Sequence, residues 1–179
     1  MKKITDVADH ELIWAQPSFA KTKYELRAGD EVVATIQFQR ATLARADAEG
    51  EAWTFKREGF WRQRVTVRRE GSDDNIAIFR PYAFGGGELL ASSGSTFELS
   101  SAHFFHPEWT WKQGERPLMQ FKGGPRMSGR SGVVALLPEA LHLPELPLLT
   151  VLGWYLILLI AKDVAVVAAT TAARVPVMR

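Results

Sequence analysis

Polar and apolar residues alternate along most of the first 137 positions of the chain. In 31–40, for example, Val32, Ala34, Ile36 and Phe38 share one face, and all residues of the other face except Val33 are polar. A period of two predicts strands with one buried and one solvated face. Similar segments, separated by turns rich in Gly, Ser and Pro, are 21–28, 53–56, 61–68, 76–79, 88–91, 96–100, 108–112, 117–122 and 132–137. About ten to twelve short strands in succession, with no βαβ alternation, favour an all-β barrel or sandwich.

A long apolar run, 146–173, follows the predicted strands. Its apolar residues occupy every side of a helical wheel, so as a helix it must be surrounded by protein or by lipid. The proline-rich stretch 138–147 predicts an extended connector before it. We therefore expect a single domain over 1–179, mainly β, in which an antiparallel barrel of strands from 10–137 encloses a central hydrophobic helix.

Hydropathy alone leaves a transmembrane span open as the alternative. From 146 to 169 there are thirteen Leu, Ile or Val residues, which contribute about −4 to −8 kcal/mol to insertion, against about +5 to +7 kcal/mol for Lys162 and Asp163. A buried helix of about 24 residues would be about 36 Å long, close to the 26 to 33 Å or so of eight- to ten-residue strands. This match favours the helix as the core of the barrel, with Lys162 and Asp163 near its mouth and bonded to separate partners. In the alternative, the helix anchors a soluble β head in the membrane.

Composition narrows the classes of function. The 179 residues are 46% hydrophobic and 23% charged, carry a net charge of +2 and include no Cys. This composition indicates a globular protein without disulfides or thiol nucleophiles, and it gives no reason to expect a nucleic-acid partner. The N-terminal residues contain no apolar segment of the kind found in secretory signals, so we expect a cytoplasmic protein.

The order of these elements resembles a known superfamily. About a dozen antiparallel strands followed by one apolar helix with a charged pair, Lys162-Asp163, resemble the Tubby C-terminal-like fold of Tubby proteins, phospholipid scramblases and LURP-one-related proteins. The strand-turn sequence 24–30 adds to the resemblance. The resemblance implies a barrel threaded by its last helix and binding at membranes. The chain lacks the Pro-rich region, the Cys cluster and the acidic calcium-loop pattern of scramblases, so the resemblance does not imply lipid scrambling.

The densest basic group lies around the segment 61–68. Alternation places Arg62, Arg64 and Arg68 on one strand face, with Arg69 beside them and Lys56 across the preceding turn. Alternate residues on a strand lie about 7 Å apart, so several guanidinium groups could converge on phosphates. A solvated face paired with nearby acids is the simpler interpretation. If the face has a ligand, we expect an anionic lipid headgroup or a phosphorylated partner, bound without a cofactor or an enzymatic reaction.

Other candidate sites are weaker. The loop 124–131 has the outline of a phosphate-binding P-loop but lacks its Lys and its α/β context, and His103, His106 and Glu108 have no recognised metal-binding spacing. Most of the six Trp residues occupy inward strand phases, Trp61 among them, and are expected in the core.

Overall fold

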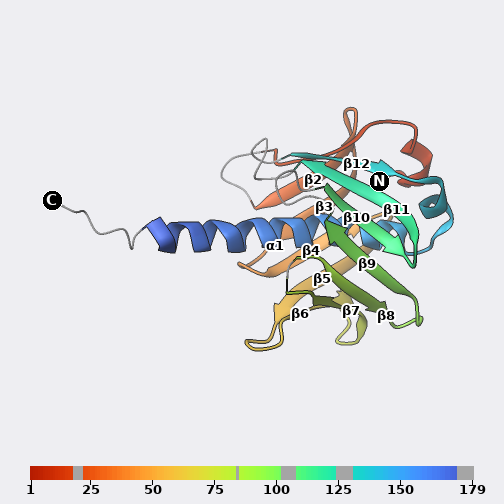
Figure 1. Ribbon diagram of the computed structural model, residues 1–179. Coiled ribbons are helices and arrows are strands. Elements are labelled where there is room, and N and C mark those ends of the chain that lie inside the picture. The colour runs from red at the N-terminus through yellow and green to blue at the C-terminus, as the bar shows by residue number, and fades with distance from the viewer. Residues whose placement is uncertain (18–21, 84, 102–107, 124–130, 173–179) are drawn as a thin grey trace.

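The computed structural model describes residues 1–17, 22–83, 85–101, 108–123 and 131–172. Its twelve strands form one closed barrel (Figure 1) in which every strand pairs antiparallel with its neighbours in sequence, and β1 closes the ring against β12. The strands are β1 (Leu12–Ala15), β2 (Lys23–Ala28), β3 (Glu31–Phe38), β4 (Leu43–Ala48), β5 (Glu51–Glu58), β6 (Arg64–Arg69), β7 (Asn75–Pro81), β8 (Gly87–Ala91), β9 (Thr96–Ser101), β10 (Glu108–Gln113), β11 (Arg116–Gly123) and β12 (Gly132–Leu136). The predicted mainly-β barrel around a C-terminal helix is confirmed.

The helix α1 (Leu146–Ala172) enters the barrel and fills its centre (Figure 1). Its residues from Leu146 to Leu159 are almost entirely buried by inward-facing strand residues. On β4 these inward residues are Ala44, Ala46 and Ala48, which are all fully buried. Because their side chains are small, the helix can pack close to this wall of the barrel.

Aromatic residues fix the depth of the helix in the barrel. Trp154 stacks on Trp14 of β1, with ring centroids 6.0 Å apart. Trp111 of β10 donates a hydrogen bond from Nε1 to the carbonyl oxygen of Leu149 at 2.9 Å. Gly153 of the helix faces Trp111 directly, since a Cβ atom at this position would lie 2.6 Å from Nε1 of Trp111. The helix therefore has one register against the strands.

The expectation that the whole helix lies inside the barrel is wrong. Its exposure begins at Ile160, and 162–170 are exposed to solvent. Strands of four to eight residues cover only the first half of a 27-residue helix, because a tilted strand of that length rises less than the helix does. We call the projecting part, residues 162–172, the helix stub.

The two ends of the barrel differ. At the end where α1 begins, which we call the closed mouth, the 3₁₀ helices η1 (Thr5–Val7) and η2 (Pro138–His142) cover the core with buried residues such as Ile4 and Ala140. The predicted extended connector is thus partly a 3₁₀ helix, which begins at Pro138, a residue whose fixed φ suits a first helical turn. At the other end, the exit mouth, the helix leaves the barrel (Figure 1).

Candidate functional site

The exit mouth carries the longer strand connections. Connections at the closed mouth span two to five residues: 29–30, 49–50, 70–74, 92–95 and 114–115. Those at the exit mouth span four to eight: 16–22, 39–42, 59–63, 82–86, 102–107 and 124–131. Longer loops on a rigid scaffold are the usual place for binding residues. The exit mouth is therefore the better candidate for a binding surface.

Large apolar side chains are exposed at this mouth. Phe60 and Trp61, in the connection between β5 and β6, are 86% and 92% exposed. Their rings pack edge to face, with centroids 5.3 Å apart, so the two side chains form one projecting unit. The expectation that Trp61 lies in the core is wrong, because β5 ends at Glu58 and β6 begins only at Arg64. The positive φ of Gly59 closes the turn that carries them.

The helix stub projects from the same mouth. Val164, Val166 and Val167 are 40%, 63% and 63% exposed, and no charged residue follows Asp163 within the described part of the stub. Thr170 donates its hydroxyl back to the carbonyl oxygens of Val166 and Val167 at 3.0 and 2.9 Å. This internal hydrogen bond reduces the need of the Thr170 hydroxyl for water. Between Val164 and Thr170 the stub therefore presents a largely apolar surface, and the hydroxyl of Thr170 is satisfied within the helix.

Two charged residues mark the boundary between the buried helix and the stub. Asp163 accepts a hydrogen bond from Arg57 of β5 at 2.6 Å. Lys162 donates to the carbonyl oxygen of Ala41 at 3.4 Å and lies over the ring of Phe38. Burial lowers the pKa of Lys162, and the nearby Arg57 lowers it further. The predicted location of both residues at a barrel mouth, with separate partners, is confirmed.

The predicted basic face is largely neutralised by acids. Arg64 and Lys56 both contact Glu58, at 3.5 and 3.2 Å, and these cations, Lys56 first, lower the pKa of Glu58. Toward the closed mouth, Arg68 bonds to Asn75 at 2.8 Å and lies 3.7 Å from Asp73. The register of β6 against β7 shifts between Val67 and Arg68, and Arg69 lies 3.7 Å from Glu51 at the closed mouth.

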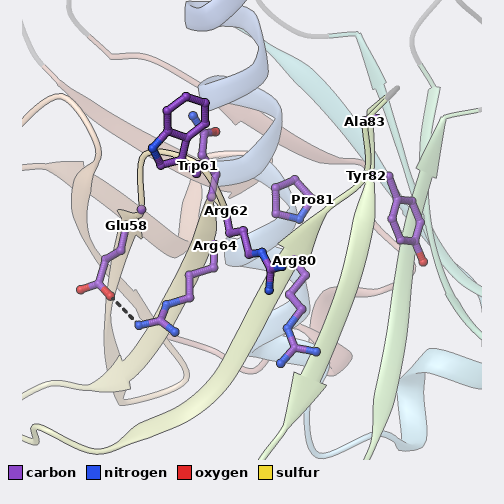
Figure 2. Close-up of a pocket in the computed structure, with 10 residues that line it drawn as sticks. Glu58, Trp61, Arg62, Arg64, Arg80, Pro81, Tyr82 and Ala83 are labelled. Atoms are coloured by element: carbon purple, nitrogen blue, oxygen red, sulfur yellow. Dashed lines mark hydrogen bonds and ion pairs between the residues drawn. The ribbon is translucent and has the colours of Figure 1, made fainter.

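A smaller arginine cluster remains at the exit mouth, formed by Arg62, Arg64 and Arg80. Val65 pairs with Phe79 across β6 and β7, so Arg64 and Arg80 occupy the next opposed positions. Within the described chain, neither Arg62 nor Arg80 forms an ion pair. Figure 2 shows the side chain of Arg64 extending toward Glu58, to which it is joined, while the side chains of Arg62 and Arg80 extend away from Glu58. The sequence prediction missed Arg80 because the register in which β7 pairs with β6 cannot be read from the turn that joins them.

Two adjoining cavities lie beside this arginine cluster. An outer cavity of about 850 Å³ is lined by the three arginines together with Trp61 and Pro81. An inner cavity of about 220 Å³ has a largely apolar lining on the helix and the barrel wall: Leu156, Leu159, Ile160, Val65 and Phe79. Gln63, Arg64, Pro81 and Tyr82 line both cavities. Together they form one groove with a cationic outer part and an apolar inner part.

The remaining candidate sites receive no structural support. The loop 124–131 lies almost wholly outside the described residues, as do His103 and His106. Glu108 lies 3.9 Å from Lys122 of the adjacent strand. Among the described residues, no group of three or more His, Cys, Asp or Glu side chains is arranged to hold a metal ion.

No family model, curated protein or solved structure matches the chain. Membership of the Tubby C-terminal-like superfamily therefore stays a prediction.

Proposed function

We propose that the protein is a non-enzymatic module that docks on an anionic membrane surface with its exit mouth. The observation that carries this proposal is the presence at one mouth of three features: the apolar helix stub, the exposed pair Phe60 and Trp61, and the arginine cluster. Exposed apolar surface next to basic residues suits the boundary between lipid tails and anionic headgroups. Anionic lipids are concentrated in the cytoplasmic leaflet, so we place the protein there.

The energetics support reversible docking. Arginines near an anionic surface contribute about 1 kcal/mol each, and full burial of a Val or Phe side chain contributes about 1.5 to 3 kcal/mol. Three arginines, the exposed valines of the stub and Phe60 together supply several kcal/mol before the cost of association. The arginine contribution should fall as salt rises, because the Debye length shortens to about 8 Å at physiological ionic strength.

A membrane-spanning helix is the second candidate. The segment Leu146–Thr170 has the length and hydropathy of a span, but half of its most apolar window is buried in the barrel. The stub of eleven residues, 162–172, is about 16 Å long, which is roughly half of a 30 Å hydrocarbon core. We therefore propose insertion into one leaflet.

Trp61 provides a direct test. It is 92% exposed, whereas the other five Trp residues are at most 6% exposed, so a water-soluble quencher such as acrylamide reports mainly on Trp61. We expect vesicles containing anionic lipid to protect Trp61 from quenching and to sediment the protein at low salt. Neutral vesicles should do so more weakly.

Matched variants separate docking from nonspecific adhesion. V166S/V167S and F60S should weaken sedimentation with anionic vesicles. Leu90→Ser should not, because Leu90 is 45% exposed on the outer wall of β8, away from the exit mouth. Equal sedimentation of all three variants, or no protection of Trp61, would refute docking through this mouth.

A further inference from the structure

We propose that the groove at the exit mouth binds a single amphiphile with a phosphate monoester head and one alkyl chain. The phosphate would lie on the arginine cluster and the chain would enter the inner cavity beside α1. This inference deepens the proposed function and rests on it for the source of the ligand, which is the membrane.

The arginine cluster is costly without an anion. Arg64 and Arg80 are opposed on neighbouring antiparallel strands, and like charges at such positions destabilise a sheet. Glu58 contacts Arg64 and also Lys56, while Glu88 pairs with Arg80 across β7 and β8 in register without an ion pair between their side chains. A bound phosphate would neutralise both arginines and accept paired hydrogen bonds from their guanidinium groups.

The charge of the groove suits a dianion. The outer cavity is lined by three arginines and one acid, Glu58, which leaves +3 − 1 = +2. In the inner cavity the further charges, Arg57 and Asp163, are bonded to each other at 2.6 Å. A phosphate monoester carries a charge of about −1.5 to −2 at neutral pH, so it matches the excess better than a carboxylate does.

The inner cavity suits a short stretch of alkyl chain. Its volume of about 220 Å³ is about seven times the share of one water molecule in the liquid. Leu156 and Leu159 of the helix, both nearly buried, form one side, and Val65 and Phe79 form the other. Because Gln63, Arg64, Pro81 and Tyr82 line both cavities, a chain attached to a phosphate on the arginines can reach this apolar space without crossing the barrel wall.

The test is calorimetric titration of the full chain with alkyl phosphates of six, eight and ten carbons, each below its micellar concentration. Each methylene that enters the cavity should tighten binding about fourfold. Inorganic phosphate and decanol should each bind far more weakly than decyl phosphate. Equal affinity for the three chain lengths and inorganic phosphate would overturn the proposal and leave an anion site only.

Variants of the arginines test where the phosphate head of the ligand binds. Arg80→Gln removes an exposed cation that has no ion pair among the described residues, so the fold should survive, which thermal unfolding can verify. It should weaken decyl phosphate binding about tenfold or more, the effect of losing one charged hydrogen bond. The matched control is Arg116→Gln, which changes an exposed arginine at the closed mouth. Equal affinity of the two variants would overturn the placement of the head.

Vesicle sedimentation of the native chain separates the two proposals. If anionic vesicles bind the protein but alkyl phosphates do not, the groove proposal fails and the docking proposal stands. If alkyl phosphates bind with the expected chain-length dependence but vesicles do not, docking fails and the groove remains a site for a soluble amphiphile.

Discussion

Replacing Gly153 with Ala tests whether the barrel surrounds the helix. In an exposed helix or a helix in lipid, this change favours the helical state by about 1 kcal/mol, because Ala is the better helix former. In the barrel, the added Cβ atom would lie 2.5 Å from Cζ of Phe121 and 2.6 Å from Nε1 of Trp111. These distances are too short for real contacts, so the aromatic side chains or the helix must shift.

The structure gives the size of the effect. Overpacking a dense core costs about 1 to 3 kcal/mol. Displacing Trp111 also weakens its hydrogen bond to Leu149, which contributes about 1 kcal/mol. Subtracting the gain in helix propensity leaves a net loss of about 1 to 3 kcal/mol in the free energy of unfolding. For a chain of this length, each kcal/mol lowers the melting temperature by about 2 to 4 °C.

Urea denaturation followed by circular dichroism measures this loss. A double-mutant cycle with Phe121→Leu identifies its cause, because removing the ring should relieve part of the cost of Ala at position 153 and give a favourable coupling energy. Unchanged or increased stability of Gly153→Ala would refute the packing described here. Additive effects of the two substitutions would place the strain elsewhere.

Two further predictions concern the helix and an acid in the barrel wall. Ending the chain after Ala161 removes only the stub, including the partner of Arg57. The truncated protein should still unfold cooperatively but no longer sediment with anionic vesicles. Ending the chain before Leu146 removes the core and should abolish the cooperative thermal transition. Glu25 of β2, only 8% exposed, contacts Lys23 and Arg27 at 3.0 Å each, and these partners, Lys23 first, lower its pKa against the opposing effect of burial. The stabilising effect of a lowered carboxyl pKa is present above the unfolded-state value near 4.5 and is lost as the pH falls through the folded-state value. Glu25→Gln should therefore cost about 1 to 2 kcal/mol at pH 7 and almost nothing well below both values, as urea titrations across this range can measure; an equal loss at both extremes would contradict the linkage.

The period of two was sufficient to predict most strands because one face of each is buried by the helix. It missed β4, where the inward residues are Ala44, Ala46 and Ala48 and small side chains give little hydropathy contrast. It also missed β1, because four residues are too short for alternation to be recognised. These two strands complete the ring, so the sequence supported a barrel without establishing its closure.

The candidate site was harder to predict because the alternation of inward and outward side chains stops where a strand ends. Alternation assigned Trp61 to the core, yet the chain turns after Glu58 and Trp61 projects into solvent. Arg57, which continues the inward phase of Phe55, instead reaches Asp163 on the helix, 106 positions away in the chain. Such pairings follow from the registers of all twelve strands, which no local pattern contains.

The continuity of α1 connects the fold to the proposed docking. A short apolar helix alone in water forms poorly, because nucleation is unfavourable, whereas the helix stub extends from a helix whose first half is held by the barrel core. Its backbone hydrogen bonds are therefore formed before it meets a membrane, as an apolar environment requires. Arg57 and Asp163 fix the direction in which it leaves the mouth. The same helix lines the inner cavity with Leu156 and Leu159, so a stub inserted in lipid would hold the groove at the headgroup level, where a phosphorylated amphiphile is presented to the arginine cluster.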